Sequence, residues 1–82
     1  MKHYGQMSDR TKRILIAQAV DSTIKYDKLV SKMYEPGFHV EVAELDAQID
    51  IYNDVRSEWA EWGGNPFELD GIVRAALRKI KC

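Results

Sequence analysis

The chain contains 82 residues, of which 45% are hydrophobic and 30% charged, and its net charge is −1. This length corresponds to one domain with a small core, and the composition is typical of a folded chain rather than a disordered one. No apolar run approaches the roughly 20 residues that cross a bilayer, and the first residues lack the apolar stretch of a secretory signal. The single cysteine, Cys82, cannot form a disulfide framework, so we expect a cytoplasmic, single-domain protein.

The first predicted helix covers residues 8–34. Ser8 is a favourable N-cap, and residues 1–7 before it are expected to fray. Apolar side chains at helical spacing form one stripe, made of Leu15, Ala19, Tyr26, Leu29, Val30 and Met33. On the other side lies a lysine row, made of Lys25, Lys28 and Lys32. The polar segment around Asp21 is a weak point at which this helix could bend or break.

The second predicted helix covers residues 40–62. The YEPGF segment at 34–38 separates it from the first helix, because the residue before a proline avoids the α region. The short alternation of FHVEV is interpreted as the entry to the helix, since a single strand has nothing to pair with. The helix carries an apolar stripe of Val42, Leu45, Ile49, Tyr52, Val55, Trp59 and Trp62.

The WGGNPFE segment at 62–68 predicts the end of one helix and the start of the next. Gly63 suits a left-handed C-cap, Asn65 an N-cap and Pro66 the first helical position, and Glu68 completes a variant of the capping box. The third predicted helix, 66–81, should bury Leu69, Ile72, Val73, Ala76 and Ile80. The predicted fold is therefore all-α: an antiparallel helical hairpin plus a shorter third helix across its open end.

No catalytic or metal-binding motif is recognisable in the chain. His3 and His39 are not part of a zinc-type spacing, and the glycines match no phosphate-binding loop. Cys82 has no neighbouring base that would activate a nucleophile. We therefore expect a protein that is not an enzyme, with no catalytic residue, no metal and no cofactor.

The charges are strongly segregated, because residues 1–34 carry +4, residues 35–70 carry −9 and residues 71–82 carry +4. In the second helix, Asp46, Asp50, Asp54 and Glu58 recur every four residues, roughly opposite the apolar stripe, and should face solvent. Both this row and the lysine row are expected to point away from the seam between the two helices. The acidic row is then either simply solvated or contacts something outside the chain.

Our first functional hypothesis is a small regulator, inhibitor or accessory factor that binds another protein. The predicted partner-binding residues are Asp46, Asp50, Asp54, Glu58, Glu61, Trp59 and Trp62. The partner would offer the lysine row of a second copy, a basic patch on another protein, or a protein site that normally holds nucleic acid. Homo-oligomerisation is expected, because small helical domains often complete their core by association.

The alternative hypothesis is a small helical nucleic-acid-binding protein. Its phosphate contacts would come from basic residues near both ends of the chain, namely Arg10, Lys12, Arg13, Arg74, Arg78 and Lys81. The acidic second helix opposes this function by repelling the phosphate backbone. Basic residues at the end of a helix are also explained by their favourable interaction with the helix dipole.

Overall fold

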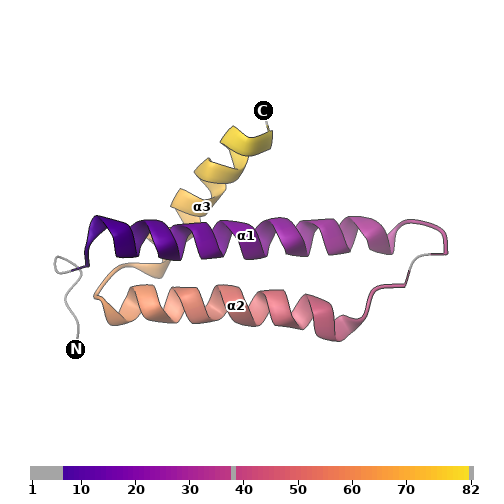
Figure 1. Cartoon of the computed structure of the whole chain (residues 1–82), viewed down its shortest axis with the longest axis horizontal. Helices are drawn as coiled ribbons and strands as arrows, with labels where there is room; N and C mark the ends of the chain where they lie inside the picture. The colour runs from indigo at the N-terminus through magenta and orange to yellow at the C-terminus, as the bar shows by residue number, and fades with distance from the viewer. Residues whose placement is uncertain (1–6, 38, 82) are drawn as a thin grey trace.

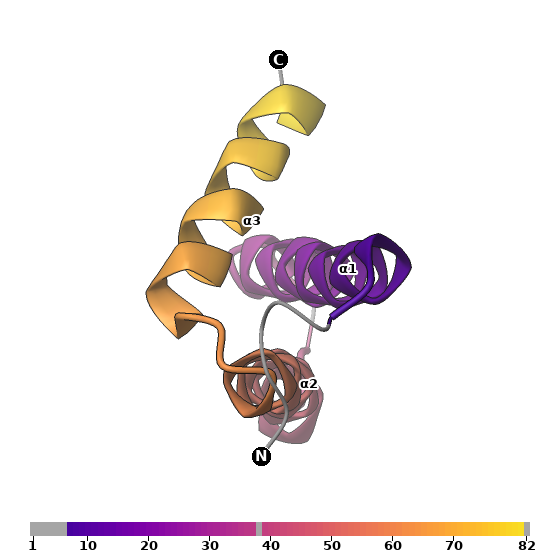
Figure 2. The same ribbon diagram turned by 90° about the vertical axis from the view of Figure 1, so that its left-hand side faces the viewer.

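The protein consists of three helices, α1 (Asp9–Met33), α2 (Val42–Glu61) and α3 (Pro66–Lys81). The computed structural model describes residues 7–37 and 39–81, and of Lys81 only the backbone. α1 and α2 run antiparallel along the longest axis, and α3 packs against the side of this hairpin near its open end before projecting away from it (Figures 1 and 2). The predicted all-α hairpin with a shorter third helix is confirmed. The FHVEV segment contains no strand in its described residues, and α2 begins at Val42, slightly later than predicted.

α1 begins where the sequence predicts it, because the Ser8 side chain accepts a hydrogen bond from the Thr11 backbone N–H at 3.1 Å. The helix continues without a break through the polar segment around Asp21. The hydroxyls of Ser22 and Thr23 both donate to the Ala19 carbonyl, at 3.0 and 2.8 Å. These side chains therefore satisfy their hydrogen bonds within the helix, which removes the reason to expect a break there.

The turn between α2 and α3 has the predicted caps at Gly63 and Asn65. Gly63 has a φ of 86°, and its N–H donates to the Ala60 carbonyl at 2.9 Å. The Gly64 N–H donates to the Trp59 carbonyl at 3.1 Å, which completes a Schellman motif. Asn65 then caps α3, because its side-chain oxygen accepts a hydrogen bond from the Phe67 N–H at 2.9 Å. This turn fixes the point at which α3 leaves α2.

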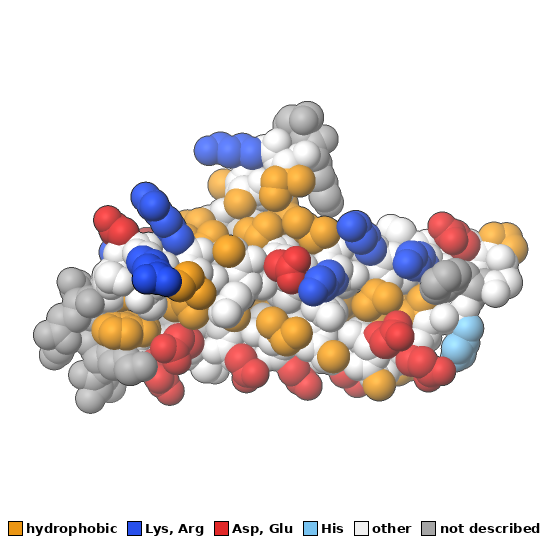
Figure 3. All heavy atoms as spheres, viewed as in Figure 1, with side chains coloured by type: hydrophobic (Ala, Val, Ile, Leu, Met, Phe, Trp, Pro, Cys, Tyr) orange, Lys and Arg blue, Asp and Glu red, His pale blue; other side chains and the backbone are white. Residues whose placement is uncertain are grey.

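The acidic and basic segments of the sequence form separate regions of the molecular surface. Figure 3 shows acidic side chains along the outer edge of α2, whereas most basic side chains in this view lie over α1 and α3. α2 contains six acidic residues and a single basic one, Arg56. The molecule therefore presents one strongly anionic helix beside two helices with an excess of cations.

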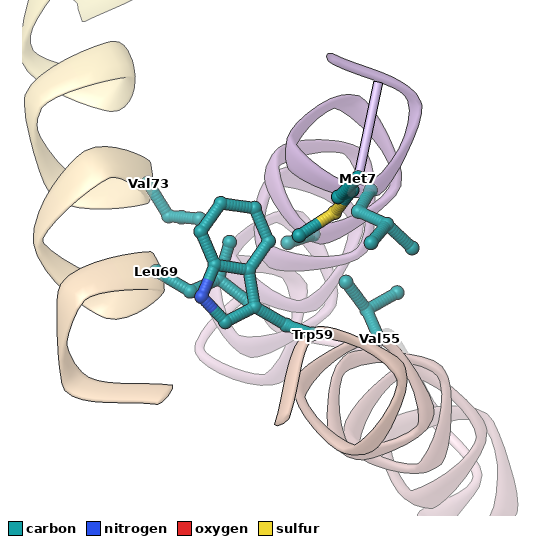
Figure 4. Packing of buried hydrophobic residues seen from close by; sticks show 7 residues of the cluster. Met7, Val55, Trp59, Leu69 and Val73 are labelled. Atoms are coloured by element: carbon teal, nitrogen blue, oxygen red, sulfur yellow. The ribbon is translucent and has the colours of Figure 1, made fainter. Parts of the chain in front are cut away.

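The core lies where the three helices meet. It consists of Met7, Leu15, Ala19, Val55, Trp59, Leu69 and Val73, all at most 6% exposed. The Trp59 indole reaches from α2 toward Leu69 and Val73 of α3 (Figure 4). Met7 is part of this cluster, so the prediction that the chain frays up to residue 7 is wrong at Met7, and residues 1–6 lie outside the described part.

Several residues predicted as core are exposed, and the path of α3 explains why. Met33, Val42 and Ile49 are 52%, 68% and 42% exposed. Met33 ends α1 and Val42 begins α2, at the closed end of the hairpin, which α3 does not cover (Figure 1). Ile49 lines a groove between the three helices that is only partly covered. Ile80 is 60% exposed because the end of α3 projects away from the hairpin. The prediction that Ile80 is buried is therefore wrong.

The uneven packing of α3 predicts different costs for two truncations on the same helix. Leu69→Ala removes a side chain that is fully buried and should reduce the free energy of unfolding by about 2–5 kcal/mol. Ile80→Ala should change it by no more than about 0.5 kcal/mol. Urea denaturation followed by circular dichroism measures both values, and equal losses would contradict the assignment of Ile80 to the surface.

The glycines at 63 and 71 should respond to alanine with opposite signs. Gly63→Ala forces a β-carbon into the left-handed region and should destabilise the fold by about 1–2 kcal/mol. Gly71 lies within α3 and a β-carbon there would meet open space, so Gly71→Ala should stabilise by about 0.5–1 kcal/mol. Thermal denaturation of the two variants compares them directly, and a stabilised Gly63→Ala protein would rule out the proposed role of the turn.

Candidate functional site

The acidic face of α2 is the first candidate site, and we define it as Asp46, Asp50, Asp54, Glu58 and Glu61. Four of these side chains are exposed, and the fifth, Glu58, is half-buried. Val55 and Trp59 of the same helix are buried in the core. In Figure 3 this face forms a line of acidic side chains along the edge of the molecule. The predicted arrangement, with carboxylates and core residues on opposite sides of one continuous helix, is therefore what the structure has.

The tryptophans do not both border the acidic face as surface residues. Trp59 is 1% exposed, so it is a core residue and not part of a partner-binding surface, which corrects the prediction for this residue. Trp62 is half-buried against the core, and its indole N–H donates to Glu58 Oε1 at 3.3 Å. Ile51 of α2, which follows Asp50 in the sequence, is an apolar side chain that is 43% exposed.

The lysine row borders the seam between α1 and α2, which corrects the expectation that it points away from it. Lys25, Lys28 and Lys32 line a shallow hollow of about 370 Å³ together with Glu44, Ala47 and Gln48 of α2. Lys25 also pairs with Asp21 of its own helix at 3.1 Å. The row therefore offers a cationic strip on the hairpin surface, beside the first half of α2.

A groove at the junction of the three helices is the second candidate site. It has a volume of about 380 Å³ and is lined by side chains from all three helices. α1 contributes Tyr26, α2 contributes Tyr52 and Arg56, and α3 contributes Asp70 and Arg74. The groove exists because α3 diverges from the hairpin after its first turns, so that its apolar side is only partly covered.

A polar network on the side of this groove joins α2 to α3. The Tyr52 hydroxyl donates to Asp70 Oδ1 at 2.6 Å, and Arg56 Nε lies 3.3 Å from the same oxygen. The Arg56 guanidinium also lies over the Phe67 ring, 5.9 Å from its centroid. Asp70 thus neutralises Arg56 and orients Tyr52 at the same time. The sequence analysis did not identify this network, although Tyr52 and Arg56 are four residues apart on one helix face.

The environment of Tyr52 keeps its hydroxyl protonated. Burial, together with the hydrogen bond to the Asp70 carboxylate and its negative charge, raises the pKa of Tyr52 from 10.0 to about 12, and the charges of Arg56 and Arg74 oppose this shift. Tyr52 is therefore a hydrogen-bond donor throughout the neutral range. A phenol with a raised pKa beside a paired carboxylate serves to fix a structure and is a poor general base.

The residues of the nucleic-acid hypothesis fall into two groups. Arg10 and Arg13 are exposed and Lys12 is half-buried, all at the start of α1, whereas Arg74 and Arg78 are exposed on α3. The side chain of Lys81 lies outside the described residues. Figure 1 places the start of α1 well away from the projecting end of α3, so these groups do not form one continuous basic surface.

Within residues 7–37 and 39–81, no group of three or more potential metal ligands lies together. His39 is exposed and lies 3.1 Å from Glu41, and His3 is outside the described residues. None of the three described helices combines the length and the apolarity that a bilayer crossing requires.

The Tyr52–Asp70 hydrogen bond predicts a specific pH dependence. The pKa of Tyr52 is higher in the folded protein than in the unfolded chain, so its contribution to stability is complete below pH 10 and decreases as the pH rises toward 12. Tyr52→Phe should cost about 1.5 kcal/mol at neutral pH and should flatten the loss of stability above pH 10. Tyr26→Phe, in the same groove, is the control and should behave like the wild type. Urea denaturation across this pH range measures both effects, and parallel curves for the wild type and Tyr52→Phe would contradict the prediction.

Comparisons with known protein families, with curated protein sequences and with solved structures found no match to this chain.

Proposed function

We propose that this protein is a non-enzymatic interaction module, acting as a small regulator, inhibitor or accessory factor, whose acidic face of α2 docks on a Lys- or Arg-rich surface of another protein chain. The observation that carries this proposal is the exposed line of carboxylates on the side of α2 opposite the core. A cytoplasmic location, expected from the single cysteine, is part of the same proposal.

The like charges of Asp46, Asp50 and Asp54 oppose folding of the isolated domain. Like charges four residues apart in a helix destabilise it by about 0.2–0.5 kcal/mol per pair. Among the described residues, Asp46, Asp50 and Asp54 have no cationic partner within ion-pair distance. A basic partner would relieve this repulsion, and opposite charges would also accelerate the encounter of the two chains.

The exposed side chains next to the acidic face fit a protein partner. Ile51 of α2 is 43% exposed beside the acidic row, so a protein docked here would also bury an apolar side chain. The basic surface could belong to a second copy of this chain, whose lysine row is accessible on the hairpin, or to a different protein. A second copy and a different protein would both offer lysine or arginine side chains, and their effects on the oligomeric state distinguish them.

Neutralising the acidic face should weaken binding to a basic chain specifically. The test variant carries Asp46→Asn, Asp50→Asn and Asp54→Asn. The matched control carries Asp21→Asn, Asp27→Asn and Glu35→Gln, which change the net charge equally at exposed positions outside α2. The probe is a fluorescent oligolysine peptide, followed by anisotropy at low salt. At about 0.5 kcal/mol per exposed pair, the test variant should bind roughly tenfold more weakly than the wild type, and the control less so.

Equal weakening in both variants would show that only net charge matters and would refute docking through α2. Sedimentation velocity at low and high salt then identifies the source of the basic surface. Association of the wild type that disappears in the test variant and at high salt assigns the partner as a second copy. A monomer under all conditions assigns it as a different protein.

The nucleic-acid alternative is tested by gel retardation at low salt, where phosphate contacts are strongest. Retardation that is lost on neutralising Arg74 and Arg78 would favour the alternative over the proposed function.

A further inference from the structure

The groove at the three-helix junction is not used by the proposed docking, because no residue of the acidic face lines it. Its volume of about 380 Å³ lies within the range of about 300–1,000 Å³ that is typical of small-molecule sites. This size suits a single small molecule rather than a partner helix. Much of the lining is apolar or aromatic, with Tyr26, Ile49, Val73 and Leu77 contributed by three different helices.

The polar groups of the groove favour an anion. Arg56 is engaged with Asp70, whereas Arg74 has no ion pair among the described residues. Arg74 is exposed and lines the groove, so its guanidinium is accessible to a ligand there. With two guanidinium groups and one carboxylate in the lining, the groove carries a net positive charge in a chain that is negative overall.

We propose that the groove binds a small organic anion with a flat or branched apolar body. Its body packs against Tyr26 and Leu77, and its anionic group pairs with Arg74. The side of the groove formed by α2 and α3 is held in place by the contacts of Asp70 with Tyr52 and Arg56. This binding does not depend on the acidic face of α2.

The probe for the experiment is anilinonaphthalene sulfonate, which combines an apolar bicyclic body, an N–H group and an anion. Its uncharged counterpart, phenylnaphthylamine, has the same rings and N–H group without the anion. Fluorescence titration of the folded protein should show saturable binding of one sulfonate dye per chain, and weaker binding of the neutral dye. Backbone NMR shifts on titration should be confined to residues around Tyr26, Gln48 and Leu77.

Two exposed arginines on α3 provide the matched variants. Arg74→Gln should weaken sulfonate binding by about tenfold and leave the neutral dye unaffected, because one charge-assisted contact is lost. Arg78→Gln removes the same charge one turn further along the helix, outside the groove lining, and should change binding by less than about twofold.

Three outcomes would overturn the proposal: no saturation, equal affinity for the two dyes, or NMR shifts concentrated away from the junction. Because oligolysine binding depends on Asp46, Asp50 and Asp54, and dye binding on Arg74, the failure of one proposal is distinguishable from the failure of the other.

Discussion

The packing of the Trp59 indole between α2 and α3 is the contact on which the other features of this structure depend. A hairpin of two helices has one apolar seam and buries little surface, whereas the indole brings Leu69 and Val73 of α3 into the same cluster as Leu15 and Ala19 of α1. An aromatic side chain of this size contributes a large share of the apolar area in so small a domain. The turn at Gly63 supports this contact, because it sets the direction in which α3 leaves α2.

The position of this core near one end of the hairpin explains the groove. α3 is held by its first turns, through Leu69, Val73 and the pairing of Asp70 with Tyr52 and Arg56, and then diverges. This divergence opens the groove. The acidic face is exposed for a different reason, because α1 and α3 both pack on the opposite side of α2.

The two surfaces differ in chemistry and would select different ligands. The acidic face is a convex row of charges that suits a macromolecular partner with basic side chains. Complementary exposed charges orient the two chains and raise their association rate more than they raise the affinity. The groove is concave and combines apolar and aromatic side chains with polar and charged ones, which suits a small molecule. The two surfaces share helix α2 but no side chain, so substitutions can abolish either surface and leave the other intact.

Features that depend on neighbours along the chain were predictable from the amino-acid sequence. Helical periodicity and the capping residues Ser8, Gly63 and Asn65 predicted three helices and their ends, and four-residue spacing placed Asp46, Asp50 and Asp54 on the side of α2 away from the core. Three features required the packing of the helices: the full burial of Trp59, the exposure of Ile80 and the contact of Asp70 with Tyr52. These outcomes depend on the angle at which α3 crosses the hairpin. That angle is set by packing between side chains far apart in the sequence, which local spacing does not encode.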